Sequence, residues 1–250
     1  MVFNTELPVR ILTHNIRYAT STLFDNERPW AERAPLIASE LLHQTRFLAG
    51  ELGSQELQSV GNTSAQPSSF ISLQEVLHDQ LHDILQALNG IEHSAVPQSI
   101  PNGPYWAHIG VARDDGKQKG EYSPILYPVK LFKLLHFENR WLSPTPNKPS
   151  KGWDAGSKRI LTTGVFEHKA TGQRFAVFNT HLDNAGAKAR EESVAIILDV
   201  IERVCEEGSV DVQGSGTATT TPRVPLNFVL AGDFNSFPTQ EAYKALIASD

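Results

Sequence analysis

The sequence predicts an α/β protein. Short runs of strand-forming residues alternate with amphipathic helical segments along all 250 residues. Polar residues repeatedly close the apolar runs, as they do where loops at strand ends carry a site. The composition, with 40% hydrophobic and 20% charged residues, is that of an ordinary globular protein. Because this length suits one core, we expect a single domain over residues 1–250.

Six short runs are predicted to be strands, several of them apolar on both faces, as buried strands are. They are residues 9–14, 70–74, 106–111, 160–167, 175–179 and 226–231. Residues 124–142 are predicted to form two strands or one long hairpin. Pro128 should restrict part of this segment to a sheet edge, because proline has no N–H to donate.

Four helices are predicted from apolar residues at helical spacing. The first begins at Pro29, and its apolar face includes Trp30, Ile37 and Leu48. The second covers residues 77–88, the third has its apolar stripe over residues 194–204, and the fourth covers residues 240–248. Two polar stretches, 53–69 and 208–221, are predicted to be flexible surface insertions, because the alternation of strand and helix resumes after each.

Charge and cysteine content exclude some classes of protein. A net charge of -6 and a pI near 5.8 oppose tight nonspecific binding to nucleic acid. Cys205 is the only cysteine, so neither an internal disulfide nor a cysteine-based zinc site can form. No signal peptide or membrane-spanning run is recognisable, which favours a cytoplasmic location without fixing the compartment. The sequence does not determine the oligomeric state.

Polar residues that could carry chemistry follow the last predicted strand. Asp233 and Asn235 lie two positions apart in Gly232-Asp233-Phe234-Asn235, so they should project to the same side. A carboxylate and an amide at one place can polarise a water molecule and hold a phosphate oxygen. An ordinary Asp/Asn turn explains the same residues equally well.

Two further strand ends carry candidate residues. The same alternation places Asn179, His181 and Asp183 on one side, where His181 could donate to phosphate or transfer a proton. Glu75 follows the strand 70–74 and could bind Mg²⁺, which takes only one or two protein carboxylates, and Asn15 could reach the same point. Taken singly, each residue is more simply explained as a hydrogen-bonded strand end or a helix start.

Together these residues resemble the endonuclease/exonuclease/phosphatase superfamily of metal-dependent phosphoesterases. The likeness runs from about residue 10 to the chain end. It is strongest to a fungal and bacterial branch of uncharacterised hydrolases, over residues 26–30, 120–125, 152–155 and 179–183. The resemblance implies a four-layer αββα sandwich of two mainly antiparallel sheets flanked by helices, with the site at one end.

The resemblance also implies roles for individual residues. Glu75 would hold Mg²⁺, with Mn²⁺ as an alternative and Asn15 nearby. Asp233 would orient or deprotonate the attacking water, Asn235 would hold the phosphate, and His181 would stabilise its growing charge. Tyr122 and Arg159 would line the phosphate pocket, and Trp153 would lie at its rim as a stacking surface. Packing is the simpler explanation for Tyr122 and Trp153.

The superfamily ends with a strand followed by Ser-Asp-His, and this sequence contains no such motif. We therefore expect a C-terminally incomplete domain whose activity is impaired. The predicted function is Mg²⁺-dependent hydrolysis of a small or lipid-linked phosphoester. A nuclease acting on DNA or RNA and a non-catalytic protein that binds phosphorylated ligands remain as alternatives.

Overall fold

The computed structural model describes residues 7–46, 68–90, 105–208, 210–211 and 223–248. Two four-stranded sheets form its centre. The first sheet has the order β1 (Arg10–Asn15), β2 (Ser69–Gln74), β4 (Ile125–Pro128), β3 (Trp106–Ile109). The second has the order β10 (Asn227–Asp233), β7 (Arg174–His181), β6 (Ile160–His168), β5 (Phe132–Trp141).

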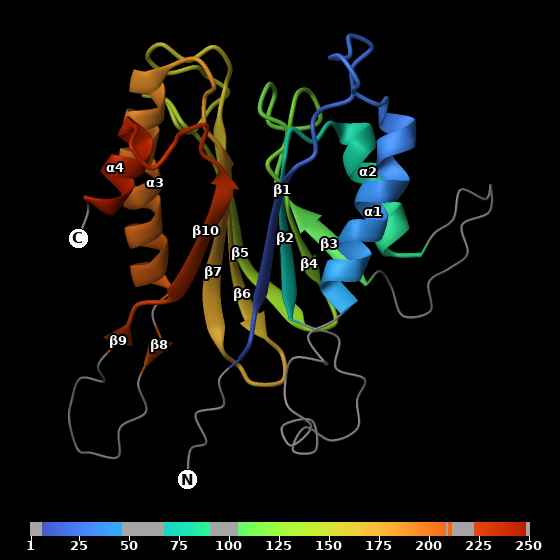
Figure 1. Cartoon of the computed structure of the whole chain (residues 1–250). Helices are drawn as coiled ribbons and strands as arrows, with labels where there is room; N and C mark the ends of the chain where they lie inside the picture. Colours follow the sequence, from blue (N-terminus) through green and yellow to red (C-terminus); the bar gives the residue numbers. More distant parts are fainter. Residues whose placement is uncertain (1–6, 47–67, 91–104, 209, 212–222, 249–250) are drawn as a thin grey trace, which may run out of the picture.

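The two sheets share one pattern of strand directions. In each, one edge strand is parallel to its neighbour, β1 to β2 and β10 to β7, and the other pairs are antiparallel. Helices α1 (Trp30–Arg46) and α2 (His78–Leu88) cover the outer face of the first sheet, whereas α3 (Ala187–Glu207) and α4 (Glu241–Ile247) cover the second (Figure 1). The predicted four-layer arrangement of two mainly antiparallel sheets is confirmed.

Each boundary between layers has its own apolar core. One cluster joins the second sheet to α3 and α4, and another joins the first sheet to α1 and α2. A third lies between the sheets, where the Phe70 ring of β2 lies 4.7 Å from the Phe132 ring and 4.8 Å from the Phe166 ring. None of the described helices is long and apolar enough to cross a bilayer.

Some predicted boundaries were wrong. β4 as a whole lies between β2 and β3, but only its first two residues pair with β2. Pro128, its last residue, pairs with β3 alone, as expected of a residue that has no N–H to donate. Ser69 belongs to β2 rather than to a polar insertion. β8 (Val210–Asp211) lies within the second insertion and pairs with β9 (Arg223–Val224), which follows it. Residues 53–67 of the first insertion, residues 209 and 212–221 of the second, and Leu48 lie outside the described residues.

Candidate active site

The predicted site residues lie where two parallel strand pairs end. Asn15 is in register with Gln74, the residue before Glu75, and Asp233 is in register with His181. β1 and β10 run side by side in Figure 1, although they belong to different sheets. The ends of four strands therefore bring residues from distant parts of the chain to the same end of the sandwich.

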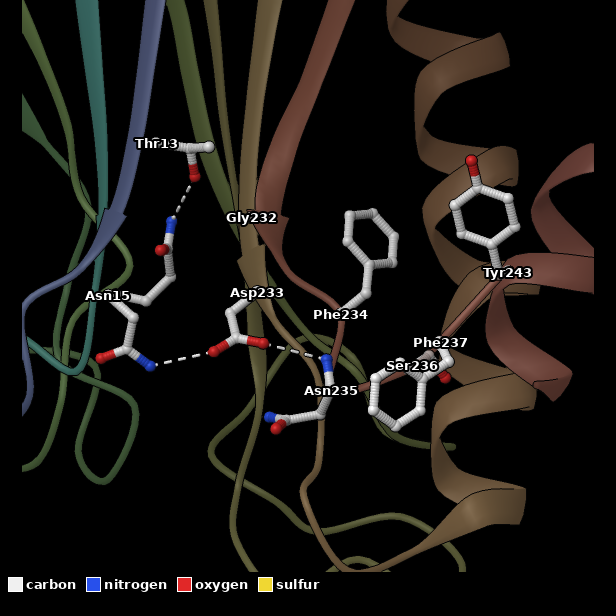
Figure 2. A pocket seen from close by; sticks show the side chains of 10 residues that line it. Thr13, Asn15, Gly232, Asp233, Phe234, Asn235, Ser236, Phe237 and Tyr243 are labelled. Carbon is white, nitrogen blue, oxygen red and sulfur yellow. Dashed lines mark hydrogen bonds between the residues drawn. The ribbon is translucent and has the colours of Figure 1, made fainter. Parts of the chain in front are cut away.

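Asn15 joins the two sheets at this point. Its Nδ2 donates to Oε1 of Glu75 at 3.0 Å and to Oδ2 of Asp233 at 2.9 Å. Figure 2 shows the Asn15 and Asp233 side chains pointing toward one another across the gap between β1 and β10. The Glu75 carboxylate from the first sheet and the Asp233 carboxylate from the second thus converge on one amide.

Glu75 is held in an unusual backbone conformation. Its φ of 58° lies in the left-handed region, which costs a non-glycine residue about 1–2 kcal/mol. Tyr18 N donates to Glu75 Oε2 at 3.2 Å, and the Arg17 guanidinium lies 3.7 Å from the same oxygen. Arg17 and Asn235 also have positive φ. Strain of this kind is typical of functional sites, where the surroundings hold the residue in place.

His181 lies beside these carboxylates and is almost fully buried. Its Nε2 lies 3.8 Å from Asp233 Oδ2, and its Nδ1 lies 3.9 Å from Glu121 Oε2. Burial lowers the pKa of His181 well below the ordinary histidine value, and the Arg159 charge lowers it further, against the opposing effect of Asp233. The ring is therefore neutral near pH 7 and can donate one hydrogen bond to a phosphate oxygen.

Asp233 and Asn235 are positioned by the turn after β10. Asn235 N donates to Asp233 Oδ1 at 2.9 Å, and Asn235 Nδ2 donates to the Leu182 carbonyl at 2.9 Å. Burial opposes ionisation of Asp233, but the hydrogen bonds from Asn15 and from Asn235 N outweigh it and lower the Asp233 pKa. Asp233 is thus an ionised carboxylate that can orient a water molecule.

Arg159 lies beneath the site, in a buried ion pair with Asp183. Its Nε lies 3.2 Å from Asp183 Oδ2, and its Nη2 donates to Asn184 Oδ1 at 3.0 Å. Four backbone N–H groups also donate to the Asp183 carboxylate, those of Gly156, Ser157, Ala185 and Gly186. Burial opposes ionisation of Asp183, but these donors hold its pKa well below its ordinary value. Asp183 therefore joins two loops to the end of β7.

The structure does not bring Tyr122 to the site. Its ring packs in the core under α1 and α2, where its hydroxyl donates to the Lys117 carbonyl and lies 3.1 Å from His78 Nδ1. The preceding residue, Glu121, faces His181 instead and is held by two short contacts with Arg113, of 2.8 and 2.7 Å. We did not predict Glu121 or Arg113. Glu121 lies in the stretch 120–125 that resembles the family, and alternation along an extended segment places it on the side opposite Tyr122.

Trp153 begins the loop that Asp183 holds. It is partly exposed and has a φ of 51°. Within the described residues, no hydrogen bond or ring contact joins it to the carboxylate cluster. The next residue, Asp154, accepts from the N–H groups of Lys188 and Ala189 at the start of α3. A substrate-binding role for Trp153 stays a prediction.

A hollow of about 630 Å³ opens beside the cluster (Figure 2). The side chains of Asn15, Asp233 and Asn235 lie on one side of it, and an aromatic wall of Phe234, Phe237 and Tyr243 lies on the other. Its other lining residues are Thr13, Gln74, Gly232 and Ser236.

The donor atoms fit a hard divalent cation. Two carboxylates converge, and Mg²⁺ commonly takes one or two carboxylates while keeping several waters. Among the described residues, no group of three or more His, Cys, Asp or Glu side chains is arranged to enclose a metal. The two carboxylates therefore fit an ion that keeps several of its waters.

Comparison with known proteins identifies the fold. No family model matches the sequence. An uncharacterized protein of Acanthamoeba polyphaga mimivirus, L388, is 29% identical over 112 residues, which are 44% of this chain and 35% of the viral protein. An endonuclease/exonuclease/phosphatase family protein of Bacteroides thetaiotaomicron is 30% identical, with a TM-score of 0.67 over 95% of this chain and 67% of that one.

Two further solved structures are similar over nearly the whole chain. A mannosyl-6-phosphatase of Bacteroides thetaiotaomicron is 30% identical, with a TM-score of 0.69 over 96% of this chain and 70% of that one. The endonuclease/exonuclease/phosphatase of Bacteroides vulgatus is 28% identical, with a TM-score of 0.69 over 97% of this chain and 71% of that one. The chain thus spans about two thirds of the length of these structures. It belongs to the endonuclease/exonuclease/phosphatase family.

Proposed function

We propose that this protein hydrolyses phosphate esters with the help of a divalent cation, Mg²⁺ or Mn²⁺. The observation that carries the proposal is the convergence of Glu75, Asp233 and His181 at the adjoining ends of both sheets. These residues lie far apart in the sequence, and each supplies a group that phosphoester hydrolysis needs.

Each side chain would have a separate task. Glu75 would hold the cation, which when bound would polarise the phosphate and neutralise its charge. Asn15 would keep both carboxylates in place, because its amide contacts the two together. Asp233 would orient the attacking water on the side of the phosphate away from the leaving group. The neutral His181 ring would donate to a phosphate oxygen as negative charge grows on it. Asn235 would hold another phosphate oxygen.

The proposed substrate is a small phosphorylated molecule or a lipid-linked phosphoester. One relative of known activity, at 30% identity, is a mannosyl-6-phosphatase. The residues that line the hollow, all in the described part of the chain, include no Lys or Arg, and the net charge of the chain is -6. A long polyanion such as DNA usually needs many cationic contacts. The aromatic wall formed by Phe234, Phe237 and Tyr243 suits a sugar ring or an apolar group instead.

The test is metal-dependent turnover by the purified chain. We expect phosphate release from mannose 6-phosphate or p-nitrophenyl phosphate with Mg²⁺ or Mn²⁺, and loss of turnover with a chelator. The variants Asp233→Asn and His181→Ala should each lower kcat by about 10²–10⁴-fold, the usual contribution of a positioned acid, base or electrostatic group. Glu202→Gln, which changes an exposed carboxylate on α3, is the matched control and should retain wild-type rates.

Two alternative functions give different results in the same assay. A nuclease would cleave DNA or RNA faster than the small esters, with binding that weakens steeply as salt increases. A protein that only binds phosphorylated ligands would show no metal-dependent turnover of any substrate. The first result would contradict the proposed substrate, and the second would contradict the proposed function.

A further inference from the structure

We infer that Gln74 and Asn179 act as a pair of positioning residues that fixes one sheet against the other and thereby sets the geometry of the site. For its kinetic consequences the inference rests on the proposed function. Gln74 is the last residue of β2 in the first sheet, and Asn179 lies in β7 of the second. Both side chains are enclosed, with exposures of 1% and 0%.

The Asn179 amide uses all its hydrogen-bonding groups across the sheet interface. Its Nδ2 donates to the carbonyls of Leu73 and Pro124, both at 2.8 Å, and its Oδ1 accepts from Gln74 Nε2 at 2.9 Å. All three partners belong to the first sheet or to the residue just before β4. Gln74 Nε2 also lies 3.2 Å from Thr13 Oγ1 of β1. One buried amide pair thus connects β7 to two strands of the opposite sheet, β1 and β2, and to Pro124 just before β4.

This pair lies directly below the site. Gln74 precedes Glu75, and Asn179 precedes His181 by two positions, so Asn179 and His181 point to the same face of β7. His181 is paired in register with Asp233 of β10, so the two residues move together. A shift of one sheet relative to the other would therefore change the distance from Glu75 to both His181 and Asp233.

Apolar contacts alone would not hold that distance. The cluster between the sheets resists separation, but the hydrophobic effect has no preferred direction and defines the relative position of the sheets less sharply than hydrogen bonds do. Hydrogen bonds weaken steeply with misalignment and so define a position. The reaction is sensitive to such shifts, since a displacement of about 1 Å can cost about 10²-fold in rate.

The test compares two variants of the same strand. Gln74→Met keeps the length of the side chain but removes its donor to Asn179, while Asn179 keeps both bonds to backbone carbonyls. Ser72→Ala is the matched control. Ser72 lies two residues earlier on the same face, is fully buried, and its hydroxyl has no hydrogen-bond partner in the described structure. Thermal unfolding checks that both variants fold.

The first readout is kinetic. With p-nitrophenyl phosphate and Mg²⁺, we expect Gln74→Met to lower kcat by at least about fivefold with little change in KM, because positioning affects the transition state more than binding. Ser72→Ala should stay within about twofold of the wild type, since no bond is lost. A kcat for Gln74→Met within that same range, or an equal loss in Ser72→Ala, would overturn the inference.

The second readout does not need turnover. The imidazole resonances of His181, assigned by their loss in His181→Ala, should shift in Gln74→Met and remain unchanged in Ser72→Ala. Unshifted resonances in Gln74→Met would overturn the inference even if the rate fell. If the wild-type chain proved inactive, the proposed function would fail, yet these resonances would still decide whether the pair positions His181.

Discussion

At the scale of single residues, the site depends on polar groups that lie buried yet are well satisfied. Asp183 is the clearest case, because its carboxylate accepts from four backbone N–H groups and from Arg159. The sequence placed it beside His181 as a possible site residue. In the structure it instead accepts hydrogen bonds from the loop after Trp153 and from the residues just before α3. No sequence pattern indicates which of two neighbouring strand-end residues will meet loop amides.

We expect Asp183→Asn to lower the free energy of unfolding by about 3 kcal/mol at pH 7, because Arg159 would lose its buried partner. The folded-state pKa lies below the ordinary value of 3.8, so the stabilising effect is fully present above about pH 4 and is lost as the pH falls toward the folded-state pKa. Urea unfolding should therefore show a difference in the free energy of unfolding between wild type and variant that decreases as the pH falls.

The control for this prediction is Asp199→Asn, which alters an exposed carboxylate on α3 and should change stability by less than about 0.5 kcal/mol. If the difference in the free energy of unfolding between wild type and Asp183→Asn stayed constant from pH 7 to about pH 2.5, ionisation of Asp183 would not be its cause.

At the scale of elements, hydrophobic periodicity predicted most of the strands and helices, whereas their ends were harder to place. β7 and β10 each continue two residues beyond the predicted end, to His181 and Asp233. Polar residues at a strand end look like loop in a sequence, and the parallel pairing that keeps these two extended is not visible there. Glu121 and Arg113 went unpredicted for a related reason, since nothing in the sequence shows that their hairpin folds toward His181.

Gly232 allows β10 to reach the site in this extended form. A Cβ at this position would lie 2.3 Å from the Thr180 carbonyl oxygen, and the φ of 153° is itself unfavourable for other residues. We expect Gly232→Ala to push β10 away from β7 where Asp233 and His181 are in register. The variant should lose at least about tenfold in kcat as well as stability. Steady-state kinetics and thermal unfolding measure the two effects.

The matched control is Gly172→Ala in the turn between β6 and β7, where a Cβ would meet open space. Its φ of 71° leaves only a local strain of about 1 kcal/mol, so activity should persist. Equal activity losses in the two glycine variants would show that contact with Thr180 is not the cause.

At the scale of the whole molecule, the site exists only where the two sheets meet. The first sheet supplies Asn15 and Glu75, and the second supplies His181, Asp233 and Asn235. Periodicity in the sequence predicted the strands but gave no indication of how they divide between sheets. The resemblance of the site residues to a family predicted two sheets, but the structure gives the division of the strands between them, because a single sequence carries little signal for contacts between distant strands. An ion bound at the site would thus contact residues from both sheets.

We therefore expect Mg²⁺ to stabilise the whole fold. Glu75 and Asp233 reach the same Asn15 amide from opposite sheets, so a cation bound by them would link the two sheets. A ligand at about 100 times its Kd stabilises the folded state by about 2.7 kcal/mol, which corresponds to an increase in Tm of about 5–10 °C for a chain of this size. Thermal unfolding across a Mg²⁺ titration measures the shift. Glu75→Gln should remove this shift while keeping a similar Tm without the ion, because the amide has the same shape as the carboxylate. Glu202→Gln, with its exposed carboxylate on α3, should respond to Mg²⁺ as the wild type does. An equal Mg²⁺-induced shift in Glu75→Gln would mean that the ion binds elsewhere, and Glu75 would lose its assignment as the residue that holds it.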